Sequence, residues 1–142
     1  MISRFITDVL INNDAIQTAT NGRIYPFEML QGTHNYPTIL WKIITSKPLG
    51  QDLWSVGEAW QSEVQISVFT KSSSASAKLS EMVCKAFNNA TLPANILSAQ
   101  ANQIVSSFLN EDETIHYAVR VFINHKFQTS NTTTNKSYTK GK

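Results

Sequence analysis

The chain has 142 residues, of which 42% are hydrophobic and 15% are charged, and its formal net charge at pH 7 is +2. The length suits one domain with a single core, and so small a net charge argues against a dedicated nucleic-acid-binding domain. One cysteine excludes an internal disulfide framework, and no stretch approaches the roughly 20 apolar residues that a membrane-spanning helix needs.

Charged residues are scarce in comparison with typical soluble domains, in which about a quarter of the residues are charged. Ser, Thr, Asn and Gln take their place. A surface rich in uncharged polar groups favours a protein that packs against other subunits. Asp8 interrupts the first apolar run and no small-residue cleavage site follows it. We therefore expect no signal peptide, and synthesis in a reducing cytoplasm.

Apolar residues at helical spacing predict a first helix over residues 2–12, with Ser3 as its N-cap. Asp14 is expected to cap a short second helical turn. Gly22, next to Asn21, can adopt the positive φ that a helix exit needs.

Two prolines then mark strand boundaries, because each lacks a backbone donor and restricts the residue before it. A brief strand is expected up to Pro26 and a longer one after Pro37.

The remaining pattern predicts strands on both sides of another helix. Residues 38–45 are almost continuously apolar, which predicts a strand covered on most of both faces. Residues 59–70 alternate between apolar and polar, which predicts a strand with one solvent-exposed face. An apolar stripe predicts a helix over residues 74–88, and two further strands are predicted over residues 103–109 and 114–127. The stripe consists of Ala75, Leu79, Met82, Val83, Ala86 and Phe87.

This order of elements is that of an α+β domain. We expect a mainly antiparallel sheet of four to five strands with two main helices packed on one face, in a single domain over residues 1–127. Residues 128–142 are polar apart from Tyr138, and we expect them to form a C-terminal tail that is disordered in isolation.

No pattern of residues indicates catalysis, a metal site or a cofactor. Cys84 would need a base, such as His116 or His125, and an electropositive setting to act as a nucleophile, so a packing role is favoured. The three histidines (these two and His34) lack metal-ligand spacing, and phosphate-loop and dinucleotide-binding motifs are absent. We expect no enzyme activity, no cofactor and no metal, with a small Cys84-dependent enzyme as the alternative.

Aromatic and acidic residues in the connections are candidates for protein contacts. Trp41, Trp54 and Trp60 lack the interleaved Lys and Arg of a nucleic-acid stacking surface, and Trp54 stands in a polar connection, where an aromatic side chain often anchors a partner. The acidic turn at residues 111–113 is interpreted as solvated surface, with contact to a basic partner as the alternative. The candidate contacts are Phe27, Glu28, His34, Trp54, Glu111, Asp112 and Glu113.

Two short segments carry a resemblance to a known family. The sequence Gly22-Arg23-Ile24-Tyr25-Pro26 follows the amphipathic first helix, and Tyr36-Pro37-Thr38-Ile39-Leu40-Trp41 opens the long apolar strand. Together with the alternating strand at residues 61–70, the helix at residues 74–88 and the closing strand at residues 116–127, they resemble the tail-completion (tail terminator, head–tail joining) proteins of long-tailed bacteriophages and prophages. The resemblance spans residues 2–127.

The resemblance implies a non-enzymatic virion protein at the tail–head junction. Such proteins form a homohexameric ring on the finished tail tube, stop its polymerisation and present a surface to the head–tail connector. The expected partners are therefore other copies of the chain, the tail tube protein and the connector or neck protein, with DNA only as cargo that passes through the lumen. Another neck or tail-tube subunit is the alternative within virion assembly. Heterologous contacts can build such a ring if their rotation closes.

Overall fold

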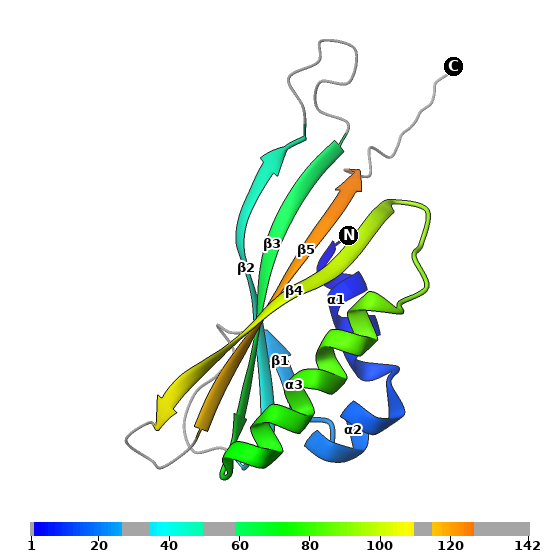
Figure 1. Ribbon diagram of the computed structural model, residues 1–142. Coiled ribbons are helices and arrows are strands. Elements are labelled where there is room, and N and C mark those ends of the chain that lie inside the picture. Colours follow the sequence, from blue (N-terminus) through cyan, green and yellow to red (C-terminus); the bar gives the residue numbers. More distant parts are fainter. Residues whose placement is uncertain (1, 27–34, 50–58, 110–114, 127–142) are drawn as a thin grey trace, which may run out of the picture.

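A computed structural model describes residues 2–26, 35–49, 59–109 and 115–126 of the chain. The elements follow one another as α1 (Ile2–Ile11), α2 (Asp14–Thr20), β1 (Ile24–Pro26), β2 (Thr38–Pro48), β3 (Ala59–Thr70), α3 (Ser73–Asn88), β4 (Ile96–Leu109) and β5 (Ile115–Lys126). The helices lie on one side of a twisted sheet, and the ends of β2 and β3 continue beyond them (Figure 1). The predicted α+β fold is confirmed.

The sheet has five strands in the order β1-β2-β3-β5-β4. β1 runs parallel to β2, and the other neighbours are antiparallel, so the sheet is mixed rather than purely antiparallel. The sequence does not reveal this parallel pair, because β1 pairs through only three residues, from Ile24 to Pro26.

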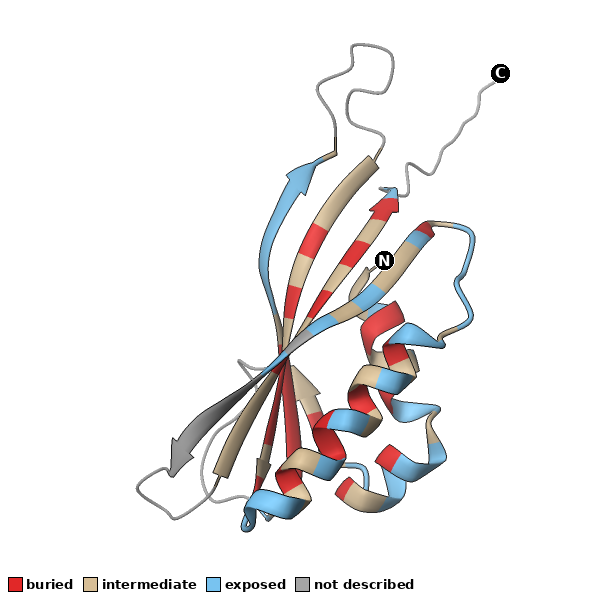
Figure 2. Cartoon of the chain, viewed as in Figure 1, coloured by how far each residue is buried: buried red, intermediate tan, exposed pale blue. Residues whose placement is uncertain are grey.

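The core lies between the helices and one face of the sheet, and Figure 2 shows buried residues in both layers. Alternate residues of β3 and β5 point to this face, as cross-strand pairs such as Val64 with Val121 and Ile66 with Val119 show. Phe5 of α1 and Phe87 of α3 meet edge to face, with ring centroids 6.2 Å apart. The two main helices therefore share one hydrophobic core with the sheet.

The connection from α2 to β1 has the backbone conformation that the sequence predicts. Asn21 and Gly22 have φ values of 53° and 78°, as a left-handed helix exit requires. The Arg23 side chain then donates from Nε to the Pro37 carbonyl at 3.0 Å, which ties β1 to the start of β2.

The predicted N-caps of the first two helices are wrong. α1 begins at Ile2, so Ser3 lies inside it. α2 is capped by Asn13, whose side-chain oxygen accepts from the Ile16 N–H at 3.1 Å, while Asp14 is the first helical residue. An amide oxygen caps as well as a carboxylate, and Asp14 contributes negative charge at the positive end of the helix.

β2 differs from its prediction in length and in cover. It runs to Pro48, and only Thr38 to Trp41 are buried, whereas the strand from Ile43 onward is exposed. An extra residue interrupts the pairing with β3 between Ile43 and Thr45. The apolar run is therefore buried only where β1 and the helices reach it.

α3 and β4 also begin earlier than predicted. Ser72 caps α3 by accepting from the Ala75 N–H, and two serines lie in its buried stripe. Ser76 and Ser80 are buried because their hydroxyls donate to the Ile115 and Ser76 carbonyls, respectively. β4 begins at Ile96 instead of residue 103.

Candidate interaction surfaces

The predicted contact residues all lie outside the described residues. This holds for Phe27, Glu28, His34, Trp54 and the acidic turn at residues 111–113, and also for the tail at residues 128–142. Their roles remain predictions.

The first candidate surface is formed by the two edges of the sheet. β4 occupies one edge, with Leu97 45% and Ile104 38% exposed. At the other edge β1 pairs only with residues 39–41 of β2, and Ile43 and Ile44 beyond it are 36% and 38% exposed. A strand edge offers unpaired backbone donors and acceptors to another strand. Aliphatic side chains thus stand exposed at both edges of one sheet.

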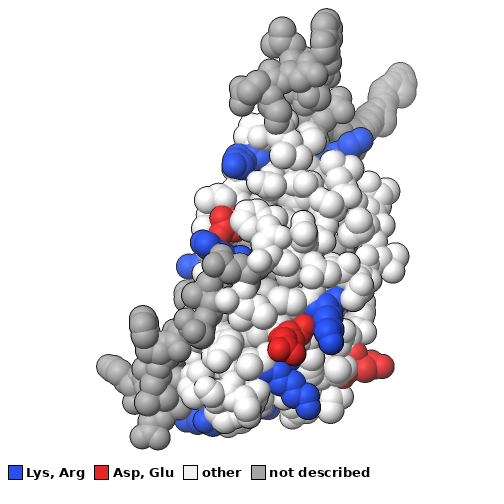
Figure 3. Space-filling model, in the orientation of Figure 1, with Lys and Arg blue, Asp and Glu red and all other residues white. Residues whose placement is uncertain are grey.

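The sheet face opposite the helices is largely polar along its centre. Arg120 and Glu63 form an ion pair at 2.8 Å, and the Asn124 side chain donates to the Ser98 hydroxyl at 2.9 Å. At the β1 end this face is less polar, because the Phe69 and His116 rings stack with centroids 4.5 Å apart. On the side of the molecule that Figure 3 shows, acidic and basic side chains are scattered singly or in small mixed groups, without an extended region of one sign.

A chain of hydrogen bonds crosses the helix side of the sheet near the end of β5. Ser46 and Ser62 hydroxyls lie 2.7 Å apart, and the Ser62 hydroxyl lies 2.8 Å from Nε2 of His125. Burial lowers the pKa of His125, which favours a neutral ring in this network. Ser62 and His125 are buried. The network links three strands, and sequence analysis missed it because the extra residue in β2 decides that Ser46 faces Ser62.

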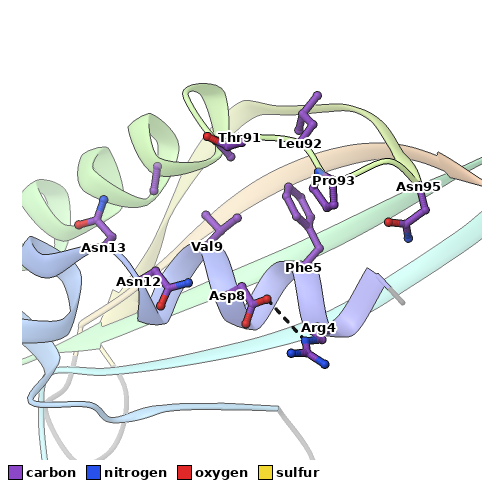
Figure 4. A pocket seen from close by; sticks show the side chains of 12 residues that line it. Arg4, Phe5, Asp8, Val9, Asn12, Asn13, Thr91, Leu92, Pro93 and Asn95 are labelled. Atoms are coloured by element: carbon purple, nitrogen blue, oxygen red, sulfur yellow. Dashed lines mark ion pairs between the residues drawn. The ribbon is translucent and has the colours of Figure 1, made fainter.

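A groove of about 850 Å³ lies between α1 and the segment that connects α3 to β4. Figure 4 shows Phe5 and Val9 pointing from α1 toward this segment, with the Phe5 ring beside Pro93 and the Leu92 side chain on the outer side of the segment. Asn12, Asn13 and Asn95 add amide groups at its margin, and Arg4 pairs with Asp8 on α1 at 3.7 Å. This combination of an apolar lining and a few polar groups is typical of a binding pocket. Sequence analysis could not find it, because its walls come from residues 4–13 and 86–95.

The structure does not favour the alternative of a Cys84 nucleophile. Burial, together with the neighbouring Glu81 carboxylate, raises the pKa of the Cys84 thiol, whereas a nucleophilic cysteine needs a lowered one. Among the described residues, no three or more His, Cys, Asp or Glu side chains gather into a metal-binding group. None of the described helices is long and apolar enough to cross a membrane.

Comparison with known proteins gives a structural match. No family model matches the sequence, and no curated protein matches it. Among solved structures, a chain from the virion of a native gene transfer agent particle matches with a TM-score of 0.65 and 13% sequence identity. The match covers 86% of this chain and 92% of that one, so the two share a fold over nearly their whole lengths.

Proposed function

We propose that this chain is a structural subunit of a phage-like virion that caps the finished tail tube. In this role copies of the chain form a homohexameric ring at the tail–head junction, end tube polymerisation and present a surface to the head–tail connector. The observation that carries the proposal is the fold that 86% of this chain shares with a chain of a gene transfer agent virion. The segment pattern around Gly22 and Pro37 adds the tail-completion resemblance.

The sheet edges support the ring. The β2 edge and the β4 edge are different surfaces at opposite sides of one sheet, so their contact is heterologous and repeats from copy to copy. Exposed Ile44 at one edge and Ile104 at the other supply apolar area for it. The polar face around Arg120 and Glu63 suits a water-filled channel, through which DNA passes as cargo.

Deletion of the gene from the phage or prophage that encodes it tests the role at the tail end. Electron microscopy of the particles should show overlong or irregular tails without heads, and expression of the intact chain in trans should restore normal ones. Tails of normal, uniform length that carry heads would overturn the proposal. Polymerisation of the purified chain into long tubes, rather than single rings, would indicate a tube subunit instead.

A further inference from the structure

We infer that the groove between α1 and the α3–β4 segment receives residues 50–58 of the next copy in the ring, with Trp54 as the anchor. The inference rests on the proposed ring and names a contact within it. It is carried by the lining of the groove, by the register of the sheet and by the chain segment that starts from the β2 edge.

The groove is suited to an aromatic anchor. The apolar part of its lining combines the side chains of Phe5, Val9 and Ala90 with those of Leu92 and Pro93, and Leu92 is 41% exposed. The remaining lining is polar and includes the ion pair of Arg4 with Asp8. Its volume of about 850 Å³ lies within the range of roughly 300–1,000 Å³ that is usual for ligand pockets. Burial of a tryptophan in such an apolar pocket is a frequent source of binding energy at protein interfaces. The apolar part of the groove therefore favours an aromatic or aliphatic side chain over a charged one.

Residues 50–58 supply such a segment. They connect Leu49 to Ala59, which are joined by a hydrogen bond of 2.8 Å from the Leu49 N–H to the Ala59 carbonyl. Their sequence contains Leu53, Trp54 and Val56, whereas residues 128–142 contain a single apolar side chain, Tyr138. A connection of this length, folded back on itself, reaches about 15 Å beyond its anchored ends.

The register of the sheet puts the start of this segment level with the groove. Pro48 pairs with Trp60, Trp60 pairs with His125, and His125 pairs with Ile96, so one row of residues crosses the sheet from edge to edge. Ile96 directly follows Asn95, which lines the groove. The Asn95 carbonyl also accepts from the Lys126 N–H at 2.9 Å, which fixes the groove to this end of the sheet.

The same row explains why the occupant belongs to another copy. Within one copy, Pro48 and Ile96 are separated by three strand spacings, or about 14 Å. In a ring whose axis runs along the strands, rotation keeps each row at one height, and the part of β2 that β1 leaves unpaired faces the β4 edge of the next copy. Pro48 then lies about one strand spacing, roughly 5 Å, from Ile96 of the neighbour. Pro48, just before this segment, is thus closer to the neighbour's groove than to its own.

Site-directed disulfide formation between two differently tagged chains tests this contact. Both chains carry Cys84→Ala to remove the native thiol; one adds Ser55→Cys, beside the intact Trp54, and the other adds Ala90→Cys in the groove. The control partner carries Lys78→Cys on an exposed position of α3. With diamide as the oxidant, we expect the tagged pair with Ala90→Cys to form about tenfold faster than the control pair. Trp54→Ala in the first chain should remove this preference, whereas Gln51→Ala should keep it.

Equal rates for the groove and control positions, whether or not rings form, overturn the inference. When both substitutions are on one chain, a disulfide that forms only within that chain shows that residues 50–58 fill their own groove, which also overturns it. Preferential linkage of Ala90→Cys to Tyr138→Cys overturns it in favour of the tail. Tail lengths after gene deletion test the proposed function separately, so a ring-forming terminator without this contact is a distinguishable result.

Discussion

Replacement of Gly22 by alanine measures the cost of one backbone angle. Gly22 has a φ of +78°, and a Cβ added there meets only the Gln17 side-chain nitrogen, at 3.7 Å, which is an ordinary contact. Crowding therefore contributes little. The left-handed conformation costs an L-alanine about 1–2 kcal/mol, and the stiffer unfolded chain offsets about 0.4–1 kcal/mol of this. We expect Gly22→Ala to lower the free energy of unfolding by roughly 1 kcal/mol.

Urea denaturation followed by far-UV circular dichroism measures this change, and the slope of the urea transition should stay the same. Thermal unfolding should show a Tm lower by about 4 °C. Gly22→Asn is the matched variant, because asparagine tolerates the left-handed region better, and it should cost about half as much. If Gly22→Ala is neutral, or if asparagine costs as much as alanine, the angle is not the source of the loss.

Three further predictions address the core, the buried histidine and the sheet edge. Phe87→Ala should lower the free energy of unfolding by about 3–5 kcal/mol in urea denaturation, because Phe87 is buried against Phe5, and a loss below about 1 kcal/mol would contradict this packing. Burial lowers the pKa of His125, so the unfolded chain binds more protons than the folded one as the pH falls through about 6.5, and the free energy of unfolding should fall with the pH. His125→Asn should flatten this part of the curve of unfolding free energy against pH. A curve that the substitution leaves unchanged would contradict a buried, neutral His125. Ile104→Lys should change the free energy of unfolding by no more than about 0.5 kcal/mol but should prevent ring formation, as measured by light scattering. Thr18→Lys, at an exposed position of α2, should leave ring formation intact. Rings formed by Ile104→Lys would exclude the β4 edge from the contact.

The sequence predicts those elements whose own residues carry a strong period or a decisive turn residue. β3 and β5 lie within a residue of their predicted bounds, because apolar and polar side chains alternate along both. Gly22 has the positive φ expected of it. The first part of β4 escapes prediction, since Ser98 to Asn102 have weak strand preference and are held by pairing with β5. Propensity yields there to tertiary pairing.

The candidate surfaces depend on relations that a single segment does not contain. The groove joins α1 to residues far along the chain, such as Leu92 and Asn95. The exposed half of β2 looks like a buried strand in the sequence, because Ile43 and Ile44 continue its apolar run, but the structure exposes both side chains. Composition favours a protein that packs against other subunits, but it does not indicate which surface makes the contact. Which edges are open follows only from the strand order.

The extra residue in β2 has a consequence for how this sheet can change over evolution. Pairing with β3 is regular up to Ile43 and resumes at Thr45, so loss of Ile44 would join two stretches that already have the right register. The same deletion in the middle of β5 would turn every later side chain to the opposite face and carry His125 away from Ser62. Insertions and deletions in related chains should therefore collect at Ile44 and be rare in β5.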